Sequence, residues 1–219
     1  MAKEKVLIIK DLSNEILDEA YDKAIVKDHT YSNENKLIRN IIKRFPENKD
    51  VNIVAMKAAL IDVTNSTHLH QYKADINLLE LAEFLTSKKL DFDNRVKLGD
   101  ESLVVDIAKN IGKINLFSFA SKYCFYHNSV LYKKDDYAKF DGIVKDCLPL
   151  YAQKYNILYS NRKITVNTLE NMRKNFNYAD FNKIVKNVLD NIKTSNKIAK
   201  FDAVMWYYNR SEQNKLDNA

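Results

Sequence analysis

The chain contains very little glycine, proline and cysteine for its length. Only three glycines, two prolines and two cysteines occur among its 219 residues. A β-rich chain of this size needs many more turn residues, so this scarcity favours long helices with short polar connections. No apolar run approaches the roughly 20 residues that a membrane span requires. We therefore expect an all-α protein that forms one compact domain over residues 1–219.

The scarcity of cysteine and histidine bears on cofactors and location. Cys124 and Cys147 are expected to be free, buried thiols, as is usual in a reducing cytosol. His68 and His70 are two residues apart and would point in different directions on a helix. We therefore expect neither a metal nor another cofactor. The four apolar residues after the charged N-terminus are too few for a secretory signal, which predicts a cytoplasmic protein.

Positive charge is concentrated in one part of the chain. The formal net charge is +6, and residues 151–200 alone carry ten Lys or Arg against three acids, a net +7. Basic residues interleaved with tyrosine and phenylalanine suit a polyanion surface such as nucleic acid. A second interpretation stays open, because lysine, asparagine, isoleucine and tyrosine are abundant throughout, as in products of an AT-rich genome. Lysines then accumulate on solvated faces without any partner.

Apolar spacing predicts a series of helices. A nearly all-apolar stretch from residue 51 to about residue 70 predicts a central helix with neighbours on most sides. Asn167 and Glu170 predict a capping box, and Pro149 predicts a kink or break. The last apolar cluster, which includes Trp206, is assigned to the core. In the second half of the chain, helices are expected at about 101–111, 118–127, 137–154, 167–176, 179–193 and 199–210.

Two residues in the middle of the chain suggest chemistry at a sugar carbon. Residues 116–122 read Leu-Phe-Ser-Phe-Ala-Ser-Lys and end in Lys122. Residues 138–144 read Ala-Lys-Phe-Asp-Gly-Ile-Val and contain Asp141. A lysine amine that desolvation keeps neutral can act as a nucleophile. An aspartate at a helix start is kept ionised by the backbone N–H groups there.

These two segments resemble the helix-hairpin-helix DNA glycosylase superfamily, to which endonuclease III and the 8-oxoguanine DNA glycosylases belong. In that family a hairpin of the form Leu-Pro-Gly-Val-Gly-Thr-Lys precedes a helix, and a segment like Pro-Val-Asp-Thr-His-Val follows at a matching interval. The resemblance places Lys122 on the nucleophilic lysine and Asp141 on the catalytic aspartate. Ser118 and Ala120 stand at the two hairpin glycines.

The resemblance implies an all-α fold with a helix-hairpin-helix element, in which residues 101–154 hold the hairpin and the catalytic segment and two helical lobes can flank a cleft. It implies DNA contacts from Ser118, Ala120 and Ser121. Thr64 and Asn65 would fill the gap left by a flipped base. The expected function is excision of a damaged or modified base from double-stranded DNA, with associated AP-lyase activity. We expect a monomer that does not bind membranes.

Two other interpretations stay open. Side chains at Ser118 and Ala120 leave less room for backbone N–H groups to approach a phosphate, so the chain could be a DNA-binding relative without catalysis. Alternatively, it could be a helical protein-interaction domain, such as one used in phage defence. That alternative predicts an exposed apolar patch in place of a basic cleft.

Overall fold

The computed structural model describes residues 6–27, 29–65, 67, 69, 77–111 and 114–210. Within these residues almost all of the regular secondary structure is helix, which confirms the all-α prediction. The elements are α1 (Asn14–Tyr21), the π-helix η1 (Asp22–Lys27), α2 (His29–Arg44), α3 (Val51–Asn65), α4 (Leu78–Thr86), α5 (Phe92–Leu98), α6 (Ser102–Lys109), α7 (Phe117–Leu131), α8 (Gly142–Lys154), β1 (Leu158–Tyr159), β2 (Arg162–Lys163), α9 (Val166–Lys174), α10 (Tyr178–Val188) and α11 (Lys197–Arg210).

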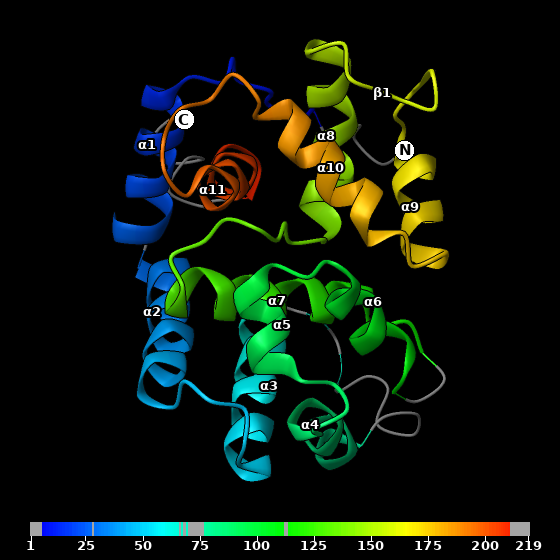
Figure 1. Cartoon of the computed structure of the whole chain (residues 1–219). Coiled ribbons are helices and arrows are strands. Elements are labelled where there is room, and N and C mark those ends of the chain that lie inside the picture. The colour runs from blue at the N-terminus through cyan, green and yellow to red at the C-terminus, as the bar shows by residue number, and fades with distance from the viewer. Residues whose placement is uncertain are drawn as a thin grey trace, which may run out of the picture.

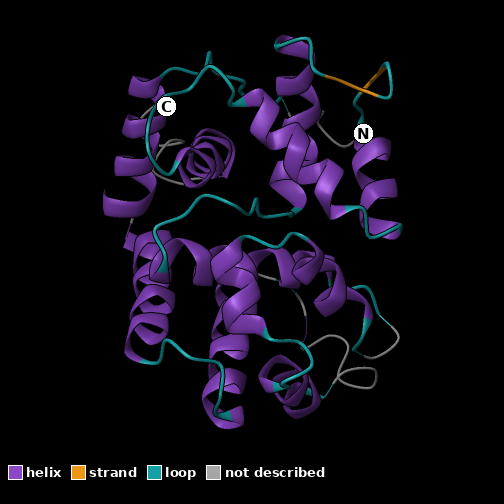
Figure 2. Ribbon diagram, viewed as in Figure 1, coloured by secondary structure: helices purple, strands orange, loops and turns teal. Residues whose placement is uncertain are grey.

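Figure 1 shows the helices in two groups, one above the other. The lower group holds α2 to α7, and the upper group holds α1, α8 to α11 and the β-hairpin. Helix α1 packs against α11, so the first and last described helices meet. Near them, the Ile8 amide donates to Asn209 Oδ1 at 2.8 Å, and Asn209 Nδ2 donates to the Ile8 carbonyl at 3.2 Å. The extended segment 132–141, teal in Figure 2, runs between the two groups.

Helix α7 is the central helix of the fold. Thirteen of its fifteen residues are buried, so neighbours cover it on nearly every side. The sequence predicted this position for α3, and that prediction was wrong, because Met56 and Val63 of α3 are 53 % and 76 % exposed. An apolar composition on all sides of a helix shows which faces can be buried, and tertiary packing decides which of them are.

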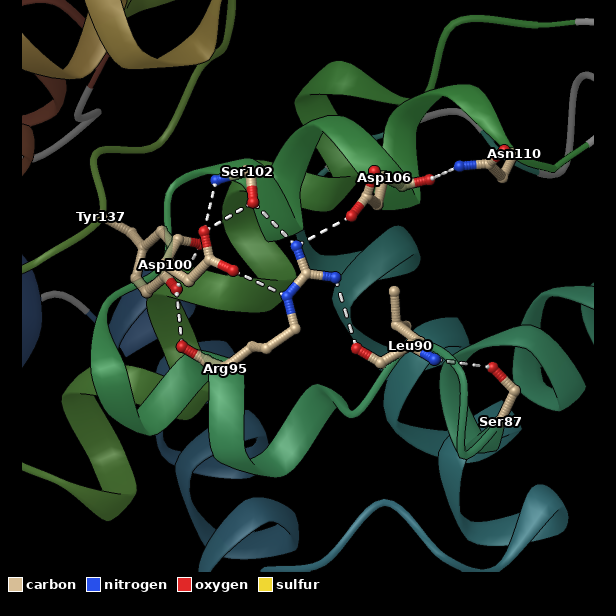
Figure 3. Close-up of polar contacts among 8 residues, drawn as sticks. All are labelled: Ser87, Leu90, Arg95, Asp100, Ser102, Asp106, Asn110 and Tyr137. Atoms are coloured by element: carbon tan, nitrogen blue, oxygen red, sulfur yellow. Dashed lines mark hydrogen bonds and ion pairs between the residues drawn. The ribbon is translucent and has the colours of Figure 1, made fainter.

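The turn between α5 and α6 is held by one arginine, shown in Figure 3. Arg95 Nε lies 2.7 Å from Asp100 Oδ2, and Nη2 lies 2.8 Å from Asp106 Oδ2. Its Nη1 donates to the Leu90 carbonyl at 3.3 Å. The same turn fixes the segment between the helix groups, because the Tyr137 hydroxyl donates to the Asp100 carbonyl at 3.0 Å.

Gly99 allows the segment 132–141 to pack closely against the turn between α5 and α6. Its φ of +75° lies in the left-handed region, and a Cβ there would meet Asp136 Oδ2 at 2.6 Å. The Asp136 carboxylate also accepts a hydrogen bond from Asn128 Nδ2 of α7 at 2.9 Å. A side chain at position 99 would therefore displace a carboxylate that is already held in place.

Three local predictions differ from the structure. Helix α8 begins at Gly142 and not near residue 137, because hydrogen bonds to other elements hold the backbone of 138–140 extended. The capping box of α9 is formed by Thr165 and Thr168, not by Asn167 and Glu170, because the helix begins earlier than predicted. Helix α8 contains Pro149 and continues to Lys154 without a break. His68 and His70 lie outside the described residues.

The core contains ionisable groups as well as apolar ones. Cys124 and Cys147 are buried and are not bonded to each other. Lys57 Nζ donates to Asn48 Oδ1 at 2.9 Å, and burial lowers the pKa of Lys57 to about 8. His127 is fully buried on α7, and burial lowers its pKa to about 3. Its ring packs 4.3 Å from the Tyr123 ring, centroid to centroid.

The buried His127 is expected to make the protein less stable in acid. Its pKa lies far below the ordinary 6.5, so between about pH 6.5 and pH 3 only the unfolded chain takes up this proton. Stability therefore falls as the pH falls, by about 3 kcal/mol from this residue at pH 4. The variant His127→Phe keeps a ring but cannot titrate, so its stability should fall less between pH 7 and pH 4. Urea unfolding of both proteins at the two pH values measures this, and equal losses would contradict the assignment.

Candidate functional site

Lys122 and Asp141 converge on one cavity. Lys122 Nζ lies 3.7 Å from Asp141 Oδ2, although one residue belongs to α7 and the other precedes α8. Both side chains line a cavity of about 490 Å³, which is within the range of roughly 300–1,000 Å³ seen for small-molecule sites. The Lys122 side chain is only 2 % exposed, whereas that of Asp141 is 26 % exposed. The amine thus lies at the bottom of the cavity and the carboxylate nearer its opening.

The surroundings of Lys122 favour its neutral form. Burial lowers the pKa of Lys122, and the nearby Lys139 ammonium lowers it further, while Asp141 acts in the opposite direction. The amine donates a hydrogen bond to the backbone carbonyl of Asn65 at 2.9 Å. The net effect is a lowered pKa, so the amine loses its proton more readily than an exposed lysine does.

Asp141 divides its two carboxylate oxygens between structure and the cavity. It is the N-cap of α8, and its Oδ1 accepts a hydrogen bond from the Val144 amide at 3.0 Å. Its Oδ2 faces Lys122. A carboxylate at a helix N-terminus is stabilised in its ionised form by the aligned peptide dipoles. The structure therefore places this carboxylate next to the amine at the start of a helix.

Two serines of α7 place Asp141 beside Lys122. Ser118 Oγ donates to the carbonyl of Phe140 at 2.8 Å. Ser121 Oγ accepts from the amide of Phe140 at 3.0 Å and donates to the carbonyl of Ser118 at 2.9 Å. Both backbone groups of the residue before Asp141 are therefore bound to the helix that carries Lys122. These serines fix the distance between the Lys122 amine and the Asp141 carboxylate.

Removing the Ser121 hydroxyl is expected to disturb this alignment. In Ser121→Ala the buried Phe140 amide loses its acceptor, which should cost about 1–3 kcal/mol of stability. Ser129→Ala is a matched control on the same helix, because the Ser129 hydroxyl reaches only the carbonyl of Tyr126 in its own helix, at 3.4 Å. Thermal unfolding of both variants measures the difference. Equal stability of the two variants would contradict the role assigned to Ser121.

In the described part of the chain, residues 116–122 do not form the hairpin that the resemblance implies. Helix α7 begins at Phe117, so Ser118, Ala120 and Ser121 lie within the helix and not in a turn before it. Ala120 and Ser121 are fully buried, and their side chains do not reach the surface, whereas Ser118 lines the cavity. Contacts between these positions and DNA stay a prediction.

Thr64 and Asn65 are the last two residues of α3 and not part of a loop. Asn65 lines the cavity, and its Oδ1 accepts a hydrogen bond from the Tyr126 hydroxyl at 3.0 Å. Its Nδ2 donates to Thr64 Oγ1 at 2.9 Å, and that hydroxyl donates to the Leu60 carbonyl at 2.8 Å. The Asn65 side chain is thus hydrogen-bonded to α7 and to its own helix. The backbone carbonyl of Asn65 accepts the hydrogen bond from the Lys122 amine.

Several cavity residues were not predicted as site residues. Trp206, which the sequence assigned to the core, is only partly buried and lines the cavity together with Arg210 from the next turn of α11. Lys145 and Glu170 also line it, and their charged atoms lie 2.9 Å apart. The spacing of four between Trp206 and Arg210 places them on one helix face, which is the signal that the sequence offered. No group of His, Cys or acidic side chains in the described residues could hold a metal ion.

Comparison with known proteins gives a family for the first part of the chain. Residues 10–135, more than half of the chain, match HI_0787_N, which is described as an N-terminal domain. The chain belongs to the HI_0787_N family. No curated protein and no solved structure matches it. No helix in the described part of the chain has the length and apolarity needed to cross a membrane.

The cavity is built from both sides of the boundary of the HI_0787_N region. Asn65, Ser118 and Lys122 lie within residues 10–135, whereas Asp141 and Arg210 lie beyond them. The HI_0787_N region therefore supplies the Lys122 amine, and the residues after it supply the Asp141 carboxylate and the Arg210 side chain of the cavity lining.

Proposed function

We propose that this protein excises damaged or modified bases from double-stranded DNA, with Lys122 as nucleophile and Asp141 as the carboxylate that stabilises developing positive charge. The observation that carries the proposal is the position of the Lys122 amine, which has a lowered pKa, 3.7 Å from an N-capping carboxylate in a shared cavity. Such a pair fits substitution at a sugar carbon better than hydrolysis by a metal, because it combines a nucleophile with a fixed negative charge.

The chemistry follows from these two groups. As the bond between base and sugar breaks, the base leaves with the electron pair and positive charge develops on the sugar, which the Asp141 carboxylate stabilises. The neutral Lys122 amine forms a bond to the anomeric carbon, and Asp141 can accept the proton that the nitrogen then loses. Opening of the sugar ring gives a Schiff base between Lys122 and the former anomeric carbon. Loss of the neighbouring 2′ proton and of the 3′ phosphate then cleaves the strand by β-elimination.

The cavity also suits the substrate. A base inside a duplex cannot reach a buried amine, so the target nucleotide must rotate out of the stack. Trp206 is a partly buried aromatic residue of the cavity lining, and Lys145 and Arg210 add positive charge there beside Asp141 and Glu170. Positive charge of this kind favours DNA phosphates and makes binding sensitive to salt.

Borohydride trapping of the unmodified protein tests the proposal. Duplex DNA with an abasic site, an 8-oxoguanine or a uracil is incubated with the protein and borohydride, which reduces a Schiff base to a stable amine. We expect a covalent protein–DNA adduct on abasic DNA and on at least one of the base lesions. If no adduct forms on any of the three, the lysine mechanism is wrong.

One observation favours a second candidate, a DNA-binding relative without catalysis. The Lys122 side chain is 2 % exposed, and its amine is bonded to the Asn65 carbonyl, so the structure stabilises the lysine without any substrate. This candidate predicts DNA binding that weakens steeply with salt, with neither base release nor a trapped adduct. Binding measured at two salt concentrations beside the trapping reaction separates the two functions.

A further inference from the structure

A second buried lysine lies close to Lys122. Lys139 Nζ is 2.5 Å from Asp202 Oδ2 on α11, and the two side chains are only 4 % and 10 % exposed. The same ammonium lies 5.0 Å from the centre of the Phe125 ring and 5.5 Å from that of the Tyr126 ring, both on α7. Tyr126 in turn bonds to Asn65, the residue whose carbonyl holds the Lys122 amine. The hydrogen bond between Tyr126 and Asn65 thus links the surroundings of the two lysines.

The two lysines differ in how well their charge is stabilised. Lys139 has a carboxylate at 2.5 Å and two aromatic faces, each of which attracts a cation. Lys122 has a neutral carbonyl and a carboxylate at 3.7 Å. Because attraction between opposite charges falls with distance, the Lys139 ammonium is the better stabilised of the two. Of these neighbouring amines, Lys122 is therefore the one that gives up its proton.

We propose that Lys139 and Asp202 are positioning residues, which hold a fixed cation beside Lys122 and so make Lys122, not Lys139, the reactive amine. This inference rests on the proposed function for the identity of the reaction, but its physical content concerns only the protonation of Lys122.

The backbone keeps this cation in place. The Ala138 amide, just before Lys139, donates to Asn182 Oδ1 at 2.9 Å, and the Phe140 amide, just after it, donates to Ser121 Oγ at 3.0 Å. Lys139 is therefore fixed on one side to α10 and on the other to α7. Desolvating a buried ion pair is costly, so apolar residues could fill this space at least as stably. A role in setting the charge of Lys122 explains why a pair occupies it.

Other charges near Lys122 must be held constant in any test. Charged or titratable groups reach its surroundings from each neighbouring element: Asp141 and Lys145 at the start of α8, Glu170 on α9, Asp202 and Arg210 on α11, Lys139 on the segment 132–141 and Tyr126 on α7 itself. Helix α3 contributes only the Asn65 carbonyl to the amine. The Lys139–Asp202 pair can be altered without changing any of the groups that line the cavity.

Removing either half of the pair should change Lys122 in opposite directions. Lys139→Met removes the neighbouring cation, so Lys122 should hold its proton to higher pH. Asp202→Asn leaves the Lys139 cation without its partner, so Lys122 should lose its proton at lower pH. The double variant Lys139→Met/Asp202→Leu removes both charges. The pKa of Lys122 should rise in it, because Lys139 affects this pKa more than Asp202 does, but it should rise by no more than in Lys139→Met.

The titration is followed without DNA, by NMR of 13C-labelled lysine side chains, with the Lys122 signal assigned from its loss in Lys122→Gln. In parallel, trapping on abasic DNA at pH 7 should be about tenfold slower for Lys139→Met than for the unmodified protein. Shifts of both single variants in the same direction, or no shift in any variant, would overturn the proposal. If a single variant does not fold, as judged by circular dichroism, the double variant decides, and an unchanged titration in it counts against the pair. Loss of trapping in the unmodified protein would refute the proposed reaction and leave the NMR result to decide this inference.

Discussion

The variant Lys122→Gln is expected to form no trapped adduct with any of the DNA substrates. The amine is the only group in the proposed mechanism that becomes bonded to the sugar, and an amide nitrogen cannot form a Schiff base. Loss of a catalytic nucleophile lowers rates by more than about ten-thousandfold in well-studied enzymes. The fold should persist, because glutamine replaces a buried amine whose carboxylate neighbour, Asp141, is partly exposed and caps α8. Gel analysis of borohydride-treated mixtures measures the loss.

Two other lysines serve as controls for this variant. Lys145 lines the same cavity, but its ammonium lies 2.9 Å from Glu170, so Lys145→Gln should still form the adduct. Lys89 is exposed in the turn between α4 and α5, and Lys89→Gln should behave as the unmodified protein does. An adduct that survives Lys122→Gln and disappears in Lys145→Gln would assign the nucleophile to Lys145 and refute the assignment made here.

Replacing Asp141 with asparagine is expected to lower the rate of base release by about a hundredfold to a thousandfold. Asparagine caps a helix about as well as aspartate, so the hydrogen bond to the Val144 amide can be kept while the negative charge is lost. The variant thus separates the two functions of the carboxylate. Stability should change little, whereas the charge on the sugar loses its stabilising partner.

A second measurement on Asp141→Asn separates bond cleavage from Schiff-base formation. Asp141 raises the pKa of Lys122, so its loss leaves the amine more often neutral. Trapping on DNA that is already abasic should therefore fall by less than about tenfold, because no base has to leave. Asp146→Asn, on the same helix but outside the cavity lining, is the matched control. Equal losses of base release and trapping would contradict the role of Asp141 as the charge-stabilising group.

Apolar spacing and the scarcity of turn residues predicted the fold class, whereas the resemblance to the DNA glycosylases predicted the meeting of Lys122 with Asp141. Apolar spacing placed the start of α8 near residue 137, and only the structure shows that Asp141 is the N-cap of this helix. The extended conformation before Asp141 could not be predicted, because apolar spacing at Tyr137 and Phe140 fits a helix equally well. Only partners distant in sequence, such as Asn182 and Ser121, hold this segment extended.

The part that α11 plays in the cavity lining could not be predicted from the sequence, for a related reason. Trp206 and Arg210 belong to the last helix, whose position depends on packing against α1. The Lys139–Asp202 pair likewise joins residues far apart in the chain, and nothing in the local sequence links them. The resemblance placed Ser118 and Ala120 in a hairpin, yet both lie within α7, which is packed at the centre of the fold.

The contact between the two ends of the described chain sets an order on synthesis by the ribosome. The segment around Ile8 is made 201 residues before its partner Asn209. Helix α1 must therefore wait, with its apolar face uncovered, until α11 has left the ribosome. Helix α11 also brings Asp202, Trp206 and Arg210 to the surroundings of Lys122. A nascent chain would thus carry Lys122 in an unfinished pocket, and its amine would acquire these surroundings only after α11 has been made.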